Sequence, residues 1–374
     1  MPKKLVLIGG GHSHALVLRL LGNKPLSGVR LALITPDIYT PYSGMLPGHI
    51  AGFYSYSQCH IDLQSLSNFA HAQLCLDHVI GLDLNNKKVL CANQPAVDFD
   101  ILSIDIGSTP SKLSVPGAAE YTIAAKPVAQ FLEHWYKLQE NAVKNPQKSL
   151  NIAIVGGGAG GVELALSMVA GLRKSEVHLF QSSQELMPSH HQLVRRIMRD
   201  ILINKDVKLH LGERVCEVVE LINKRLAIKC ESGLMVTCDY AFWVTQASAA
   251  SWLKAAGIGT DDQGFILVND YLQSVTHPHI FAAGDIAKMI NYELPKAGVF
   301  AVRQGKPLYE NLRRMISGAS LKPYKPQTTY LSLIGTGDGR ALANRGNLTL
   351  PPHQLWWCWK DLIDRNFMEQ FPHQ

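Results

Sequence analysis

The stretch that decides the fold is Leu5-Val6-Leu7-Ile8-Gly9-Gly10-Gly11-His12-Ser13-His14, an aliphatic run that leads directly into three glycines. The run predicts a buried strand, and the residues after the glycines predict a helix. In such a strand–turn–helix unit the glycines permit a tight turn and let the backbone approach a pyrophosphate. The helix N-terminus then offers unpaired N–H groups and positive dipole to that anion. The stretch therefore predicts a dinucleotide-binding turn.

A second stretch repeats this pattern near the middle of the chain. It reads Ile152-Ala153-Ile154-Val155-Gly156-Gly157-Gly158-Ala159-Gly160-Gly161, again with a strand-like run before the glycines and a helix-like run after them. One motif of this type would be weak evidence on its own. Two of them, each opening its own segment, indicate that one protein holds two nucleotides.

Length and composition are those of a folded protein with more than one domain. The chain has 374 residues, of which 47% are hydrophobic and 18% are charged. This length exceeds the size at which single cores stop growing. The formal net charge of +6 is mild. It permits attraction to anionic lipid, but no Lys/Arg block is dense enough to indicate a nucleic-acid partner.

Signals for secretion, membrane insertion and metal binding are weak or missing. A strand begins too near the N-terminus to leave room for a signal peptide. The segment 152–172 has Glu163 as its only charge and resembles a membrane span, but its glycines fit a strand–turn–helix unit better. The seven cysteines form no CxxC pair, which indicates reduced thiols and a cytoplasmic protein. His12 and His14 lie two residues apart, off one helical face, so we expect no metal site.

Strand-like and helix-like patterns alternate through both halves of the chain. Prolines and glycines between residues 35 and 48 predict an ordered loop. A β-meander is expected over residues 72–82 and 87–91. Further strands are predicted at 5–8, 29–34, 101–106, 151–155, 177–181, 240–245, 280–283 and 329–334, and helices at 12–22, 124–144, 159–172, 190–204 and 297–317.

Asp285 follows a buried strand, Ile280-Phe281-Ala282-Ala283, and one glycine. This places a carboxylate at the C-terminal edge of a sheet, where doubly wound sheets bind their ligands. An ionised Asp only accepts hydrogen bonds, so it suits the hydroxyl groups of a ribityl or ribose chain. The alternative is an N-cap of the following helix. The two glycine turns upstream favour the cofactor.

Taken in order, four elements resemble the pyridine nucleotide–disulfide oxidoreductase superfamily over essentially the whole chain. They are the first glycine turn, Ile106-Gly107-Ser108, the second glycine turn with Gly161-Val162-Glu163-Leu164, and Gly284-Asp285. Within it the chain is most similar to type II NADH dehydrogenases and their quinone-reducing relatives. Segments 40–48 and 360–371 resemble the dehydrogenase-like module that is fused ahead of selenide, water dikinase in some proteins.

The resemblance implies FAD in the first nucleotide site and NAD(P)H in the second. It implies two catalytic residues, Glu163 near the nicotinamide and Lys296 near the flavin. Glu163 also has a structural alternative, in which a carboxylate in the first turn of its helix favours the dipole. The implied FAD contacts are Gly9, Gly11, His12, Ser13, Thr35, Pro41, Gly44, Met45, Val79, Gly107 and Asp285, and the implied NAD(P)H contacts are Gly156, Gly158, Gly161 and Gln181.

The predicted fold class is α/β, with two Rossmann-like domains of three-layer ββα architecture and a short C-terminal segment. We expect a split FAD-binding domain over residues 1–118 and 246–325. An NAD(P)-binding domain over 119–245 is inserted into it. Residues 326–374 form the C-terminal segment with an amphipathic helix.

Departures from the family pattern concern the glycine turns and their ribose acids. His14 replaces the third glycine of the first turn, so closer packing of helix and strand is not expected there. Thr35 and Gln181 stand where an acid would take the ribose hydroxyls, which leaves the choice between NADH and NADPH open. The loop 40–48 contains no Cys, so a dithiol relay to a disulfide substrate is not expected.

Lys296 belongs to a Lys-x-Gly element, Lys296-Ala297-Gly298, that is similar to sulfide:quinone oxidoreductases. A cation beside the flavin pyrimidine would stabilise the anionic reduced ring. Those enzymes also need a cysteine pair, and no Cys lies between Cys91 and Cys216, which disfavours sulfide chemistry. Type II dehydrogenases have a Gln that contacts quinone near the position of Val299, so this contact is missing from the present sequence.

The C-terminal segment 355–371 has helical periodicity. Leu355, Trp359, Ile363, Phe367 and Phe371 form the predicted apolar face, and Lys360, Asp361, Asp364 and Arg365 the polar face. Three Trp residues suit a membrane interface. Packing on the protein's own core or on a second subunit, as in a homodimer, is the equally weighted alternative.

The predicted function is hydride transfer from NAD(P)H to flavin, followed by electron transfer to a quinone-like or other small acceptor. The first alternative is a flavin-binding regulatory or assembly protein linked to selenium metabolism. The second is a sulfide:quinone-type oxidoreductase. The rate at which NADH reduces the flavin separates the enzyme from the regulatory protein.

Overall fold

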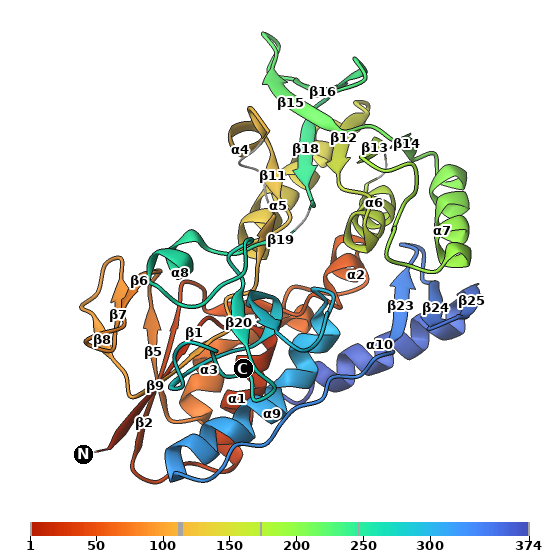
Figure 1. Ribbon diagram of the computed structural model, residues 1–374. Helices are drawn as coiled ribbons and strands as arrows, with labels where there is room; N and C mark the ends of the chain where they lie inside the picture. The colour runs from red at the N-terminus through yellow and green to blue at the C-terminus, as the bar shows by residue number, and fades with distance from the viewer. Residues whose placement is uncertain (1, 111–114, 173, 246, 373–374) are drawn as a thin grey trace.

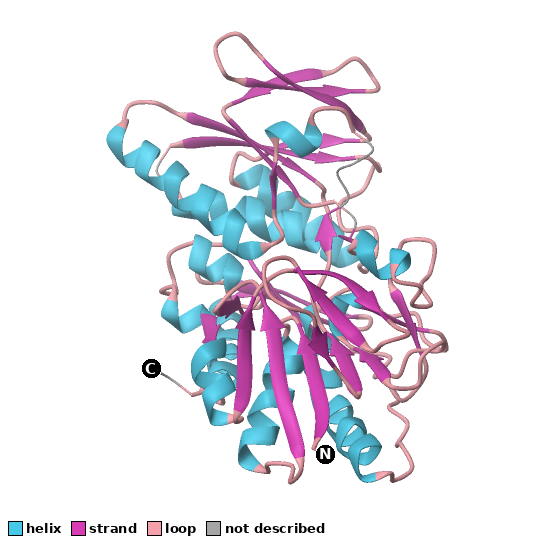
Figure 2. Ribbon diagram, turned by 90° about the vertical axis from the view of Figure 1, so that its left-hand side faces the viewer, coloured by secondary structure: helices cyan, strands magenta, loops and turns pink. Residues whose placement is uncertain are grey.

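Two five-stranded parallel sheets form the frame of the molecule (Figures 1 and 2). The structure is a computed structural model and describes residues 2–110, 115–172, 174–245 and 247–372. In the first sheet the strand order is β21-β9-β1-β2-β5, and every neighbouring pair is parallel. Its strands are β1 (Lys3–Ile8), β2 (Val29–Thr35), β5 (Ala72–Leu76), β9 (Ile101–Ile104) and β21 (Ile280–Ala282).

The order of strands reverses at β1, so the first sheet has its switch point between β1 and β9. Ligands of doubly wound sheets bind in the crevice at this point. Helices α1 (His12–Asn23) and α9 (Gly298–Ser317) pack on each other beside the sheet, and α3 (Leu63–Phe69) packs against α1. The first glycine turn therefore opens onto the crevice.

The second sheet has the order β11-β18-β12-β13-β14 and is also parallel throughout. Alternate residues of β12 enter different cores, because successive side chains point to opposite faces. Ile152 and Ile154 pack with the helices, whereas Ala153 and Val155 pack with an antiparallel sheet. The elements are β11 (Ile123–Ala124), β12 (Leu150–Val155), β13 (Ser175–Gln181), β14 (Lys208–Leu211), β18 (Tyr240–Trp243), α5 (Val128–Lys144), α6 (Ala159–Gly171) and α7 (Gln192–Asn204).

Smaller antiparallel sheets accompany each parallel sheet. The second sheet is covered by β15 (Val215–Glu220), β16 (Leu226–Cys230) and β17 (Met235–Cys238), which completes a ββα arrangement. The first is accompanied by β6 (Val79–Asp83), β7 (Lys88–Cys91) and β8 (Val97–Asp98). The remaining short elements are β3 (Tyr39–Pro41), β4 (His60–Asp62), β10 (Thr109–Pro110), β19 (Ala247–Ser248), β20 (Ile266–Val268), β22 (Ala287–Met289), α2 (Leu46–Ile50), α4 (Ala118–Tyr121), α8 (Ser251–Ala255), η1 (Ser57–Cys59) and η2 (Gly284–Ile286).

The predicted α/β class with two parallel sheets is confirmed, but the predicted meander over 72–82 is wrong in its first part. β5 pairs in parallel with β2 and so belongs to the main sheet. The meander begins only at Val79. Both parts are short and alternating, so periodicity alone could not tell a parallel edge strand from a hairpin strand.

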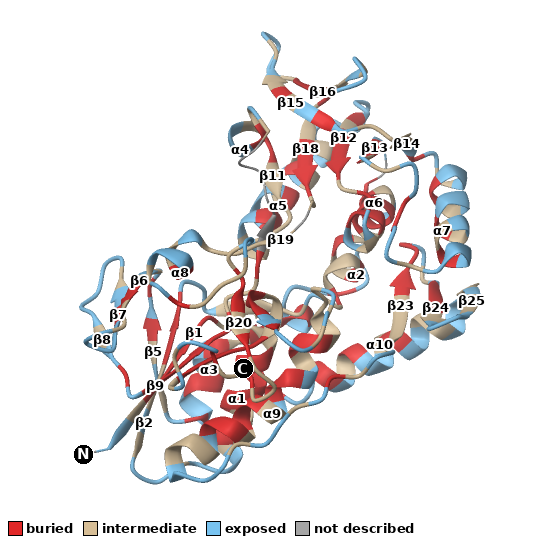
Figure 3. Ribbon diagram, in the orientation of Figure 1, coloured by how far each residue is buried: buried red, intermediate tan, exposed pale blue. Residues whose placement is uncertain are grey.

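The C-terminal segment forms an antiparallel sheet of β23 (Leu331–Gly335), β24 (Ala341–Arg345) and β25 (Leu348–His353), followed by α10 (Gln354–Met368). The predicted faces of this segment do not separate by burial, as the mixed colours along α10 in Figure 3 show. Phe367 and Phe371 of the predicted apolar face are buried, but Leu355, Trp359 and Ile363 of that face are exposed. Lys360 and Asp364 of the predicted polar face are buried. Buried charges occur when they pair, and these two are 2.5 Å apart. Periodicity of hydrophobic residues cannot reveal such a pair.

Within the described ranges, every helix is too short or too polar to span a bilayer. The segment 152–172, rejected as a span, contains most of β12 and all of α6. The domain boundaries stay a prediction. Position 246, where the second part of the first domain was expected to begin, and residues 373–374 lie outside the described residues.

Candidate active site

The first glycine turn carries a backbone that only glycine adopts readily. Gly9 has φ +90, and a Cβ there would lie 2.4 Å from the carbonyl oxygen of Asp105. Gly11 is the N-cap of α1 and, because it is a glycine, it has no side chain that could accept a hydrogen bond from the first turn of the helix. The turn therefore has the predicted strand–turn–helix geometry. The N-terminus of α1, with its unpaired N–H groups, forms the mouth of this helix and faces the end of β9.

His14 occupies the third glycine position of this turn and is fully buried. Its Nδ1 lies 2.7 Å from the Gly9 carbonyl oxygen, and its Nε2 lies 2.8 Å from Ser103 Oγ. Burial lowers the pKa of the imidazole to about 4. His14 is thus neutral at pH 7 and links the turn, α1 and β9 by hydrogen bonds where glycine would allow direct contact.

Asp105, which the sequence analysis did not single out, lies directly at the mouth of α1. Its Oδ2 accepts hydrogen bonds from the backbone N–H of Ser13 at 2.9 Å and of His14 at 3.2 Å. The side chain is 2% exposed, and this burial raises its pKa to about 7. The sequence did contain a signal: Asp105 is an acidic residue near the end of the predicted strand 101–106, two positions before Gly107.

The second glycine turn is open where the first is filled. Gly156 has φ +121, and a Cβ on Gly161 would lie 1.8 Å from the Gly156 carbonyl oxygen, so helix and strand touch. A Cβ on Gly158 would meet nothing within 4 Å, and no side chain caps α6. Gln181 accepts a hydrogen bond from the N–H of Gly157 at 2.8 Å. The N-terminus of α6 therefore offers the open space and the positive end of a helix dipole that a pyrophosphate requires.

Asp285, at the start of η2, faces a pocket with two lysines. Lys126 Nζ is 2.8 Å from its Oδ2, and Ser108 Oγ donates to the same oxygen at 3.3 Å. Burial would raise the pKa of Asp285, but the Lys126 and Lys296 ammonium groups and the hydrogen bond from Ser108 together outweigh it and hold the pKa below its ordinary value. The carboxylate is therefore ionised, as acceptance of ribityl hydroxyls requires.

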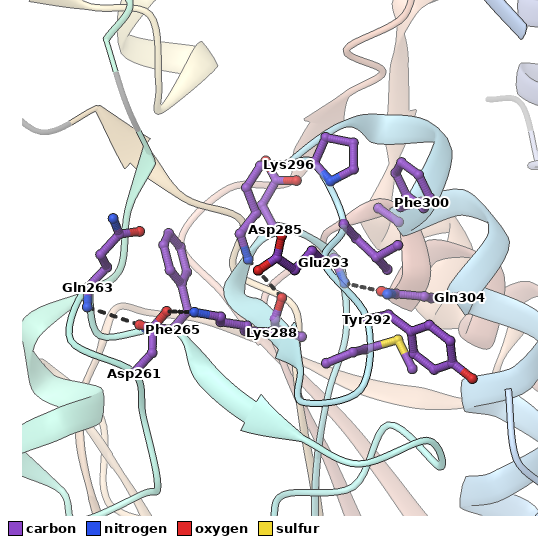
Figure 4. Close-up of a pocket in the computed structure, with 16 residues that line it drawn as sticks. Asp261, Gln263, Phe265, Asp285, Lys288, Tyr292, Glu293, Lys296, Phe300 and Gln304 are labelled. Carbon is purple, nitrogen blue, oxygen red and sulfur yellow. Dashed lines mark hydrogen bonds and ion pairs between the residues drawn. The ribbon is translucent and has the colours of Figure 1, made fainter. Parts of the chain in front are cut away.

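Lys296 lies beside Asp285 in this pocket (Figure 4). Its Nζ donates to the Ala287 carbonyl oxygen at 2.8 Å and sits 3.9 Å from the centre of the Phe265 ring. Burial lowers its pKa to about 8, although Asp285 opposes the shift. The pocket measures about 250 Å³.

A second pocket, of about 440 Å³, lies between the two sheets. It shares Asp285 and Lys296 with the first pocket and adds Lys126, Val244 and Thr245, which follow strands of the second sheet. Val244 directly follows β18. The structure thus brings the predicted flavin-side residues Asp285 and Lys296 to an opening that the second sheet also lines.

Glu163 lies in the second turn of α6, so its predicted place in the first turn is wrong and the dipole alternative loses its basis. Its Oε1 accepts a hydrogen bond from the N–H of Gly335, at the end of β23, at 2.8 Å. Burial raises its pKa, and Lys360 opposes this. The residue is engaged with the C-terminal segment.

The loop 40–48 is held by α10, through residues from both the predicted polar face and the predicted apolar face. Lys360 Nζ donates to the carbonyl oxygen of Gly44 and pairs with Asp364. Tyr42 stacks on Phe367, with ring centroids 4.5 Å apart. Two residues four apart on a helix with opposite charges were the available signal.

The remaining predicted FAD contacts are spread along the first half. Pro41 O lies 3.2 Å from His12 Nε2, and Met45 is fully buried in the core. Thr35 is buried at the end of β2, and Val79 begins β6. Gly107 has φ +68 with open space around it. These residues lie on the C-terminal side of the first sheet, and their contacts with FAD stay a prediction.

Two glycine turns at helix N-termini, and a pocket lined by residues that follow strands of both parallel sheets, are the features expected of an α/β oxidoreductase with two nucleotide cofactors. The model of the pyridine nucleotide-disulphide oxidoreductase family matches residues 3–305, and the chain belongs to this family. The prediction of an FAD- and NAD(P)H-dependent oxidoreductase of the type II NADH dehydrogenase kind is confirmed at this level.

Curated relatives match over most of the chain. Ferroptosis suppressor protein 1 of Xenopus tropicalis is 31% identical over 271 residues, which are 70% of this chain and 69% of that protein. The NADH dehydrogenase-like protein YutJ of Bacillus subtilis is 24% identical over 345 residues, 89% of this chain and 90% of YutJ. Demethylphylloquinone reductase NdbB of Synechocystis is 25% identical over 281 residues, 72% of this chain and 68% of NdbB.

Among solved structures, NDH2 from Plasmodium falciparum in complex with NADH shares the fold. The TM-score is 0.81 at 14% identity, over 99% of this chain and 97% of that chain. The narrower resemblance to the module fused ahead of selenide, water dikinase stays a prediction.

Proposed function

We propose that this protein takes hydride from NAD(P)H onto a bound FAD and passes the electrons to a quinone-like acceptor. The observation that carries the proposal is the opening between the sheets. Asp285 and Lys296 come after β21 of the first sheet along the chain, Val244 and Thr245 follow β18 of the second sheet, and all four line this opening. We also propose the domain limits 1–118 with 246–325, 119–245 and 326–374.

On the nicotinamide side, the chain binds the dinucleotide through the mouth of α6. Gly158 leaves room for the pyrophosphate, and the helix N-terminus supplies its N–H groups. Gln181 fixes the turn through Gly157. Gln181 carries no charge, so it does not discriminate strongly between a ribose hydroxyl and a 2′-phosphate.

On the flavin side, FAD supplies a ring that accepts hydride and then releases electrons one or two at a time. Asp285 would accept hydrogen bonds from the ribityl hydroxyls, and Lys126 pairs with this carboxylate at 2.8 Å. Lys296, whose pKa burial lowers to about 8, would place a positive charge beside the flavin ring. Proximity of two bound rings, with little acid–base chemistry, carries the rate.

Glu163 and Lys360 join the C-terminal segment to the rest of the protein. Glu163 ties α6 to β23, and Lys360 ties α10 to the loop at Gly44. Both bonds end on backbone groups, so they hold segments in place without needing a particular ligand.

A quinone-like acceptor is supported by the similarity to one quinone-reducing relative and by an exposed surface of α10. NdbB is a demethylphylloquinone reductase. Leu355, Trp359, Leu362 and Ile363 of α10 are all more than 40% exposed. An apolar helix face with a Trp suits a membrane interface, where lipid-soluble quinones reside. We propose that this face makes peripheral contact with the bilayer.

The test is anaerobic stopped-flow mixing of purified protein with NADH and with NADPH. We expect a yellow protein whose flavin absorbance bleaches within milliseconds to seconds and returns when a soluble quinone is added. Slow bleaching over many minutes would support the regulatory alternative. A well-folded, colourless protein that binds no added FAD would overturn the proposal.

Vesicle co-sedimentation tests the membrane contact. Wild-type protein should pellet with vesicles of phosphatidylcholine and phosphatidylglycerol, and the triple variant W359S/L362S/I363S should stay in the supernatant with its NADH oxidation intact. Dimerisation that the triple variant abolishes, with no vesicle binding by the wild type, would assign the same face to a second subunit instead.

A further inference from the structure

Asp105 is a buried acid that the proposed reaction does not use, at the place where an anion is expected. It follows β9 at the switch point of the first sheet. Its Oδ2 takes the backbone N–H groups of Ser13 and His14, which are the groups that the mouth of α1 offers to a phosphate. The carboxylate thus caps α1 from a neighbouring strand.

The space around this carboxylate is made by two glycines. A Cβ on Gly11 would lie 2.3 Å from the Cγ and Oδ1 of Asp105. A Cβ on Gly284 would lie 2.3 Å from Oδ1. The acid therefore fills the junction between α1, β9 and η2, and any anion at the mouth of α1 lies next to it.

The groups that face Asp105 do not neutralise it. Asp285, from η2, adds negative charge, and Lys126 is already paired with Asp285. On α1, His12 and His14 are buried and burial lowers both pKa values, so they stay neutral at pH 7. From α9, Gln304 reaches the Gly284 N–H with an uncharged amide. Within the described ranges, no ion pair of Asp105 with a Lys or Arg is recorded.

We propose that binding of the FAD pyrophosphate is coupled to protonation of Asp105. One proton passes from solvent to the carboxylate as the cofactor enters, and it returns to solvent when the cofactor leaves. Oδ1 is the site for this proton, because both recorded backbone bonds go to Oδ2. Without the proton, two negative charges compete for the same N–H groups. The proposal rests on FAD occupying the first turn.

Equilibrium binding of FAD to the apoprotein tests the coupling. Flavin fluorescence quenching should give a wild-type dissociation constant that rises about tenfold per pH unit above pH 7, as expected for uptake of one proton. D105N should bind more tightly above pH 7, and its dissociation constant should rise much less steeply with pH than that of the wild type, the remaining rise coming from Lys296, whose pKa is about 8. Calorimetry in buffers of different ionisation enthalpy should show about one proton taken up by the wild type at pH 8, and much less by D105N.

Asp62 provides a matched control. It caps α3 with the same arrangement, accepting from the N–H groups of Gln64 at 2.8 Å and Ser65 at 3.0 Å. D62N should keep the pH slope and the proton uptake of the wild type. The wild-type calorimetry needs no variant, so the test survives if D105N fails to fold.

Two results would separate the failures. FAD binding that is independent of pH and takes up no proton overturns the coupling and leaves the proposed function intact. Absence of FAD binding at every pH overturns the proposed function and the coupling together.

Discussion

The two glycine turns begin alike and then treat the same backbone carbonyl in opposite ways. Gly9 and Gly156 both have positive φ after a parallel strand. In the first turn an imidazole, His14, hydrogen-bonds the Gly9 oxygen at 2.7 Å. In the second, the bare Cα of Gly161 lies against the Gly156 oxygen. A polar bridge and a close contact are thus two solutions to one packing problem.

The residue after the neighbouring strand differs as well. Asp105 follows β9, and Val244 follows β18. Both donate their backbone N–H to the strand before the glycines, Asp105 to Ile8 and Val244 to Val155. The glycine pattern therefore specifies the course of the backbone, while the adjacent strand decides which charge a phosphate meets.

Gly161→Ala should have the largest effect, because the added Cβ would collide with a backbone oxygen that cannot move aside. We expect the free energy of unfolding to fall by about 4 kcal/mol or more, with loss of NADH binding. Urea unfolding and NADH titration measure both. Gly158→Ala is the control, since its Cβ enters open space: it should keep the stability and weaken only NADH binding.

His14→Ala should come next. It removes both hydrogen bonds of the imidazole and leaves the Gly9 carbonyl and Ser103 hydroxyl buried without these partners. We expect a loss of about 3 kcal/mol in unfolding free energy. Ser103→Ala removes one bond only and should cost about 1 kcal/mol. Equal losses in the two variants would mean that the imidazole does not bridge the turn.

Asp105→Asn should change the pH dependence of stability in the apoprotein. Burial raises the pKa of Asp105 to about 7 in the folded state, above its unfolded value, so the folded state binds more protons between these values. Wild-type stability should therefore fall, relative to D105N, by about 1.4 kcal/mol between pH 6 and pH 8. Urea unfolding at both pH values measures this difference. A constant difference would contradict the assigned shift.

Gln181→Glu should have the smallest effect. The new carboxylate can still accept a hydrogen bond from the Gly157 N–H. Its negative charge would favour hydrogen bonds from the ribose hydroxyls and repel a 2′-phosphate. We expect the preference for NADH over NADPH to rise about fivefold, or about 1 kcal/mol, in kcat/KM. Gln184→Glu, a neighbouring loop residue outside the turn, should leave the preference unchanged.

Local patterns predicted most of the fold. The strand before each glycine turn and the helix after it were placed within a few residues, because alternation and glycine act within one segment. Partners across space were not predictable. β5 joins the main sheet through β2, and Asp105 meets α1 from another strand. Lys360 and Asp364 were predicted only as part of a polar helix face, and their burial as a pair was not predicted, since hydropathy does not register a paired charge.

The buried Lys360–Asp364 pair carries an evolutionary consequence. Removing one partner leaves a charge in the interior, which costs several kcal/mol, whereas replacing both by apolar residues is tolerated. The two positions should therefore covary among descendants of this chain: lineages that lose the lysine should also lose the acid. A family tree in which either charge vanishes alone, with α10 still docked on the Gly44 loop, would show that the helix is held by its aromatic residues.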